Sequence, residues 1–250
     1  MTSLSRQRKA LRMFVFPVAA LTLALAAMAI PAFASATTQN WYECKHVGGG
    51  GYTNSQCTTA GKGTYEWSKL TSPTEIKTSA ASPFHINWTL GGEKLSVGCS
   101  GATLAKEGKA ENHTGANGTI SRTYLEFSGC ALTTSLQCEL TTSKLFTEPL
   151  ALEATEVAGE PGLAITPRTP NGPLTYLEVA GGNCPPGQKG FKTVNLPEGG
   201  RLFGNYRSGS LLEFQSSKNA LTVGPPTVNA TMEGTEKIET AAGGGLKIAP

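Results

Sequence analysis

The chain has 250 residues, with 21 basic and 18 acidic side chains and a net charge of +3. Four of the basic residues lie within the first twelve positions, and without them 17 basic side chains stand against 18 acidic ones. This balance disfavours nucleic acid as a partner, because phosphate binding needs clustered lysine and arginine. All eighteen acidic residues are glutamate, which excludes an aspartic-protease dyad and the usual aspartate-rich calcium loops.

The N-terminus has the order of a secretory signal peptide. Four positive charges and no acid precede an apolar run over about residues 13–33, and small residues follow. Cleavage after Ala34 or after Ala36 fits this pattern. An uncleaved anchor helix is the alternative, since the apolar run is long for a signal. We expect residues 1–36 to be a signal peptide, the mature chain to lack a membrane span, and the protein to be secreted or held in the cell envelope.

The chain contains six cysteines: Cys44, Cys57, Cys99, Cys130, Cys138 and Cys184. An even number in an exported chain predicts three disulfides, for which fifteen connectivities are possible. We expect local bridges Cys44–Cys57 and Cys130–Cys138 and, by elimination, Cys99–Cys184. Zinc bound by Cys44, His46 and Cys57 is an alternative, but this spacing matches no structural zinc pattern. We therefore expect no metal and no cofactor.

The clearest strand signal is the stretch FHINWTLGGEKLSVGC, from Phe84 to Cys99. Two alternating runs flank Gly91-Gly92, and glycine supplies the positive φ angles that two-residue hairpin turns need. Counting outward from this turn places Leu90 opposite Glu93 and Phe84 opposite Cys99, with the large apolar residues on one face. We expect this face to pack in the core, and the polar face shows no recognisable site.

The remainder of the chain predicts an all-β fold. About a dozen short strand candidates are separated by proline- and glycine-rich turns every eight to twelve residues, as in an antiparallel β-sandwich or, alternatively, a barrel. The only candidate helix runs from Ala102 to Ala110. We expect residues 37–250 to form a single domain, with a possible subdivision at the Pro/Gly-dense stretch 159–173.

Aromatic side chains in the glycine-rich segment before the hairpin are the candidate binding residues: Trp41, Tyr42, Tyr52, Tyr65 and Trp67. Aromatic rings at the end of a β fold can stack on sugars or contact another protein of the envelope. The alternative is that these rings close the end of the core.

The order of these segments resembles that of a group of uncharacterised exported bacterial proteins. The shared features are the signal peptide, the early Trp/Cys/Gly segment, Val97-Gly-Cys99, the aromatic-Ser-Gly-Cys run of 127–130, and a glycine-punctuated C-terminal half. The resemblance implies an exported β fold and no particular activity.

Two functions fit these observations. The first is a non-catalytic structural or ligand-binding module of the cell envelope, with a glycan or another envelope protein as its partner. The alternative is a secreted carbohydrate-active hydrolase that uses a pair of glutamates as acid and base, for which Glu126 and Glu213 lie on expected strands. The sequence predicts no specific catalytic residue, and we regard the first function as the expected one.

Overall fold

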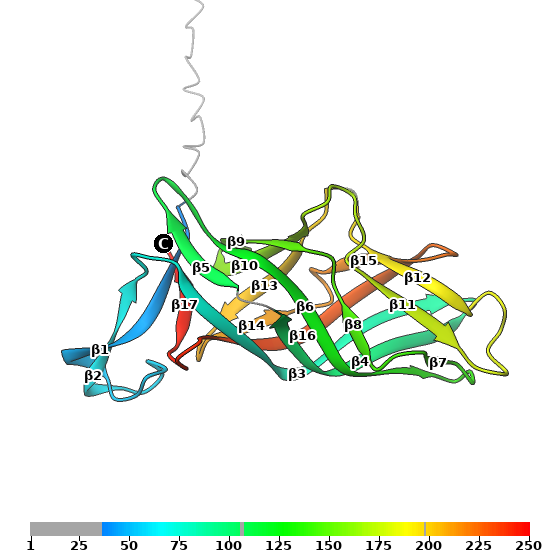
Figure 1. Ribbon diagram of the computed structural model, residues 1–250, viewed down its shortest axis with the longest axis horizontal. Helices are drawn as coiled ribbons and strands as arrows, with labels where there is room; N and C mark the ends of the chain where they lie inside the picture. The colour runs from blue at the N-terminus through cyan, green and yellow to red at the C-terminus, as the bar shows by residue number, and fades with distance from the viewer. Residues whose placement is uncertain (1–36, 106–107, 198) are drawn as a thin grey trace, which may run out of the picture. The chain divides into compact units, whose positions relative to one another are not determined.

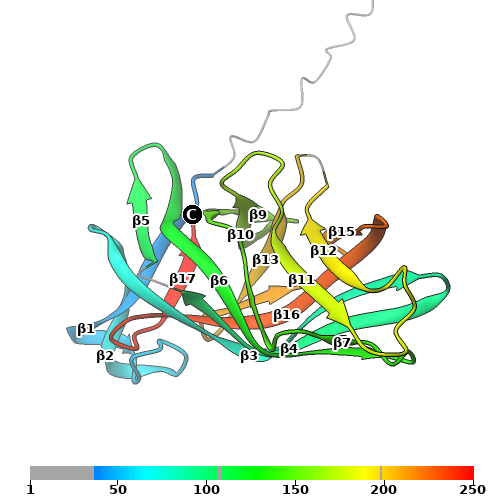
Figure 2. The ribbon, with the colours of Figure 1, turned by 45° about the vertical axis from the view of Figure 1, so that its right-hand side comes forward.

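The computed structural model describes residues 37–105, 108–197 and 199–250, so the predicted signal peptide lies outside the described residues. The described residues form seventeen strands and no helix, and the strands pair in an antiparallel manner. The predicted all-β, antiparallel class is therefore confirmed. Figures 1 and 2 show these strands, coloured from blue to red along the chain.

Three strands form a small sheet in the order β17-β1-β2, namely β17 (Leu246–Ala249), β1 (Asn40–Tyr52) and β2 (Ala60–Lys69). The other fourteen strands form a larger sheet. They are β3 (Thr74–Leu90), β4 (Glu93–Ala105), β5 (Lys109–His113), β6 (Ala116–Thr134), β7 (Glu139–Leu140), β8 (Lys144–Phe146), β9 (Leu150–Val157), β10 (Glu160–Pro167), β11 (Thr175–Ala180), β12 (Gly190–Asn195), β13 (Leu202–Arg207), β14 (Leu211–Phe214), β15 (Ala220–Gly224) and β16 (Val228–Thr240).

The pairings of the larger sheet form two closed circuits that share its long strands β3, β6 and β16. One circuit runs β16-β3-β5-β6-β9-β10-β13-β14 and returns to β16. The other runs β16-β3-β4-β6-β8-β11-β12-β15, where a single bridge between Thr147 and Thr175 joins β8 to β11. Each long strand is thus paired along both edges, and the stretch 159–173 contributes β10 to the first circuit.

The predicted hairpin is confirmed residue by residue. β3 pairs with β4 from Phe84 opposite Cys99 to Leu90 opposite Glu93, and Gly91 and Gly92 both have positive φ. The predicted apolar face is buried, with Trp88 5% and Val97 0% exposed. The alternation of apolar and polar residues and the Gly91-Gly92 turn were together sufficient to set the register of this hairpin.

The predicted helix at Ala102–Ala110 is wrong. Residues up to Ala105 belong to β4, and β5 begins at Lys109. Ala102 lies opposite Phe127 and Leu104 opposite Leu125 in the β4–β6 ladder. Pairing with a distant strand therefore overrides the helical propensity of this alanine-containing segment.

Three disulfides are present, as predicted, but only one has the predicted partners. Cys44–Cys57 is confirmed, whereas the other bridges are Cys99–Cys130 and Cys138–Cys184. The pairing of β4 with β6 places Cys99 directly opposite Cys130, so the predicted local bridge Cys130–Cys138 does not form. Cys138 then reaches Cys184 where β7 pairs with β11.

The core extends through both circuits. Phe84 connects the two, because its ring lies 5.5 Å from the ring of Phe127 and 5.5 Å from that of Phe214. Gly234 of β16 makes room for it, since a Cβ there would lie 2.7 Å from a carbon of the Phe84 ring.

Candidate functional site

The predicted aromatic residues lie on the two faces of the small sheet. Trp41 is opposite Ile248 in the ladder and is 0% exposed. It packs in the core, where no ligand can reach it, so the structure removes Trp41 from the predicted binding set. Tyr42, Tyr52, Tyr65 and Trp67 are half-buried.

These four remaining aromatic side chains have contacts within the protein. Lys247 of β17 lies with its Nζ 5.4 Å from the centre of the Tyr42 ring and 4.9 Å from that of Trp67. Burial in this position lowers the pKa of Lys247. Tyr52 packs edge-on against Trp67, with 6.5 Å between ring centres. Cation–π and aromatic contacts within the protein therefore already occupy part of the surface of these rings.

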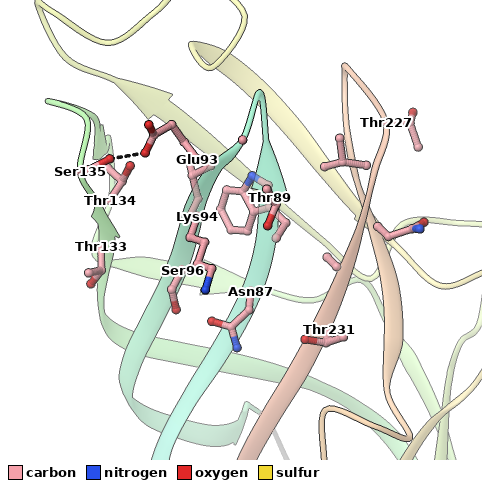
Figure 3. A pocket seen from close by; sticks show the side chains of 16 residues that line it. Asn87, Thr89, Glu93, Lys94, Ser96, Thr133, Thr134, Ser135, Thr227 and Thr231 are labelled. Carbon is pink, nitrogen blue, oxygen red and sulfur yellow. Dashed lines mark hydrogen bonds between the residues drawn. The ribbon is translucent and has the colours of Figure 1, made fainter.

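A hollow of about 1240 Å³ lies on a different surface, over the predicted polar face of the hairpin. Its floor is formed by β3 and β4, one wall by the end of β6 and the other by the start of β16 (Figure 3). Hydroxyl and amide side chains predominate among its polar residues, which are Asn87, Thr89, Glu93, Lys94, Ser96, Thr133, Thr134, Ser135, Thr227, Asn229 and Thr231. Such groups can both donate and accept hydrogen bonds.

Two charged side chains line the hollow. Glu93 accepts a hydrogen bond from the hydroxyl of Ser135, while Lys94 forms no ion pair with any residue that the structure describes. Asn87 donates weakly to Glu233 just outside the hollow, with 3.4 Å between nitrogen and oxygen. Lys94, Asn87 and the threonine hydroxyls are thus left with hydrogen-bonding capacity for a polar ligand.

Sequence reasoning missed this hollow. The polar face of the hairpin was recognisable from the alternation of Asn87, Thr89, Lys94 and Ser96, and their register was correctly predicted. The walls come from Thr133–Ser135 and from 227–231, and only the tertiary pairings β4–β6 and β16–β3 bring these segments to the hairpin. No local sequence signal connects them.

Glu213 and Glu236, the described glutamates whose pKa is shifted, have surroundings that do not suit the acid–base pair of a hydrolase. Glu160 and Glu213 converge, but both bind the guanidinium of Arg207, at 2.8 and 2.9 Å. Hydrogen bonding to Arg207 lowers the pKa of Glu213. Burial raises the pKa of Glu236 to about 7, yet this side chain is 3% exposed and inaccessible to a polysaccharide. The glutamate with the raised pKa, Glu236, is therefore not one of the two glutamates whose carboxylates converge.

The other predicted glutamate, Glu126, forms an ion pair with Lys144 at 2.7 Å. Within the described residues no three His, Cys or Glu side chains come together as metal ligands. Cys44 and Cys57, two members of the alternative zinc set, are joined to each other. Among the described residues there is also no helix with the length and apolarity to cross a membrane.

No known protein family, curated protein or solved structure matches this chain.

Proposed function

We propose that this protein is an exported, non-catalytic binding module that takes a carbohydrate in the hollow over β3, β4 and β16. The single observation behind the proposal is that neutral hydroxyl and amide groups predominate among the polar side chains that line this hollow. Sugars present many hydroxyl groups, and side chains of this kind recognise them by paired donation and acceptance. Rigid, doubly paired strands hold these groups in place at little entropic cost on binding.

Export is supported by the predicted signal peptide, by the resemblance to exported bacterial proteins, and by three disulfides, which indicate an oxidising environment. The proposed location is the extracellular space or the cell envelope. Another envelope protein is the second partner that fits such a location, and the experiment below distinguishes it from a glycan.

The test is a glycan array screened with the chain 37–250, followed by calorimetry with the strongest ligand. We expect the double variant Asn87→Ala/Thr231→Ala to bind about tenfold or more weakly, because two sets of hydrogen bonds to the sugar are lost. Thr103→Ala is the matched control, since Thr103 is an exposed threonine of β4 outside the hollow.

Thermal unfolding should show both variants to be as stable as the native chain. Absence of glycan binding, or equal affinity of the double variant and the native chain, would contradict the proposal. Capture of an envelope protein without any glycan binding would replace the glycan with the second partner.

A further inference from the structure

Three large apolar side chains are exposed in the described part of the chain, and they lie on neighbouring strands. Phe146 of β8 is 48% exposed, Tyr176 of β11 47% and Phe191 of β12 70%. All three are more exposed than the half-buried aromatic residues of the small sheet. Exposed aromatic rings gathered in one place are typical of interaction sites.

The strand register places these rings on one face. The bridge between Thr147 and Thr175 brings Phe146 alongside Tyr176 in the antiparallel pair. Phe191 lies opposite Glu178, two residues along the strand from Tyr176 and on the same face. We call Phe146, Tyr176 and Phe191 the aromatic row. It crosses β8, β11 and β12: β11 and β12 lie side by side in Figures 1 and 2, and the labelled β8 lies next to β11 in Figure 1.

Packing on the other face fixes the outward direction of the rings. Leu145, Leu177 and Val194, on the same three strands, are all 2% exposed or less and lie in the core. Successive side chains in a strand point to opposite faces, so the rings cannot turn inward without exposing these residues. The Thr175 hydroxyl also donates to the carbonyl of Phe146 at 2.7 Å, which ties β8 to β11 beneath the row.

The charges beside the aromatic row restrict its partner. Glu126 lies opposite Phe146 and is neutralised by Lys144. Glu178 lies opposite Phe191, accepts a hydrogen bond from Thr141 at 3.0 Å, and forms no ion pair with the other described residues. A free carboxylate and the negative faces of the rings both repel anions. The charge of Glu178 therefore disfavours acidic polysaccharides and anionic lipid surfaces, and favours a partner whose hydrogen-bond donors reach Glu178.

We infer that the aromatic row binds a neutral, extended polysaccharide, with its sugar rings stacked on Phe146, Tyr176 and Phe191. Pyranose rings with equatorial substituents have apolar C–H faces that complement the ring faces, and their rims carry hydroxyl donors for Glu178. Phe146 is directly opposite Tyr176, at a spacing of about 4.5–5.5 Å, whereas Phe191 is a diagonal neighbour of Tyr176 at about 7–8 Å. An extended chain of several sugars can therefore contact all three rings. The aromatic row is a second surface, independent of the hollow, and takes a longer ligand.

The experiment measures binding of cellobiose, cellohexaose and chitohexaose to the chain 37–250 by calorimetry. We expect at least one hexasaccharide to bind about tenfold or more tightly than the disaccharide, because only the longer chain covers all three rings. Phe191→Ala and Tyr176→Ala should each weaken hexasaccharide binding by about five- to tenfold. Phe191→Tyr should retain binding, because the ring is kept.

Leu211→Ala is the matched control, since Leu211 is a half-exposed apolar residue on the strand β14, away from the row. Thermal unfolding of each variant checks that the fold is intact. The inference is overturned if neither hexasaccharide binds, if Phe191→Ala and Tyr176→Ala bind as the native chain does, or if the chain binds phosphatidylcholine vesicles through these residues and no glycan. Loss of binding only in Asn87→Ala/Thr231→Ala would support the hollow and reject the row.

Discussion

At the scale of single residues, two buried ionisable side chains, Lys192 and Glu236, differ in how completely they are hydrogen-bonded. Lys192 is 5% exposed, and its ammonium group donates to the carbonyl oxygens of Gly187, Lys189 and Pro225 at 2.6 to 3.2 Å. It ties the loop before β12 to the turn before β16. Glu236 is equally buried, yet its Oε1 has no hydrogen-bond partner among the described residues. A hydrogen bond with the side chain of Thr78 lowers the pKa of this carboxyl group, but by less than burial raises it.

The consequence for Glu236 is a stability that depends on pH. Burial raises its pKa from 4.5 to about 7, so between these values the folded chain holds a proton that the unfolded chain has released. The contribution of Glu236 to stability therefore falls as pH rises from about 4.5 to 7 and stays low above that. A shift of this size corresponds to roughly 3 kcal/mol.

We predict that Glu236→Gln is more stable than the native chain at pH 8, by up to roughly 3 kcal/mol, and that this advantage shrinks towards pH 5. Urea unfolding of both proteins at several pH values measures the difference directly. Because all other glutamates titrate in both proteins, their contributions cancel. A difference that does not change between pH 5 and 8 would show that Glu236 titrates normally.

At the scale of the strand, β16 has to pass the ring of Phe84 where the two circuits meet. Its pairing with β3 is irregular on both sides of Thr235, and Gly234 has a φ of +154°. A side chain at this position would strike the ring that contacts both Phe127 and Phe214. Glycine is required here both by the space available and by the backbone conformation.

We predict that Gly234→Ala lowers the free energy of unfolding by about 2 kcal/mol or more, through overpacking and an unfavourable φ. Gly48→Ala is the matched control, because Gly48 lies in β1, has no neighbour within 4 Å and does not have positive φ. Chemical denaturation measures both. Equal stability of the two variants would mean that Phe84 moves aside freely.

At the scale of the whole molecule, the disulfides follow the strand pairing and not the proximity of cysteines in the sequence. Cys99–Cys130 joins two directly paired strands, and Cys138–Cys184 closes a separation of 46 residues in the second circuit. In the loop-entropy model the latter bridge stabilises the fold by up to about 4 kcal/mol. It therefore holds together the part of the fold that carries the aromatic row.

We predict that a non-reducing peptide map recovers Cys44–Cys57, Cys99–Cys130 and Cys138–Cys184. The double variant Cys138→Ala/Cys184→Ala should lose up to about 4 kcal/mol of stability while Cys99–Cys130 remains in its map. Recovery of a Cys130–Cys138 peptide would contradict the β4–β6 register. Stability unchanged in the double variant would show that the bridge adds nothing beyond the strand pairing.

The sequence by itself determined what local chemistry controls. The alternation around Gly91-Gly92 set the hairpin register, and the turn residues divided the remaining strands. Only the tertiary structure decided what depends on distant partners. The β4–β6 ladder placed Ala102–Ala105, the first part of the expected helix, in a strand and set Cys99 opposite Cys130 instead of leaving Cys130 for Cys138. The pairings of β6, β8, β11, β12 and β16 assembled the hollow and the aromatic row from segments tens of residues apart, because which strands become neighbours depends on the packing of the whole core.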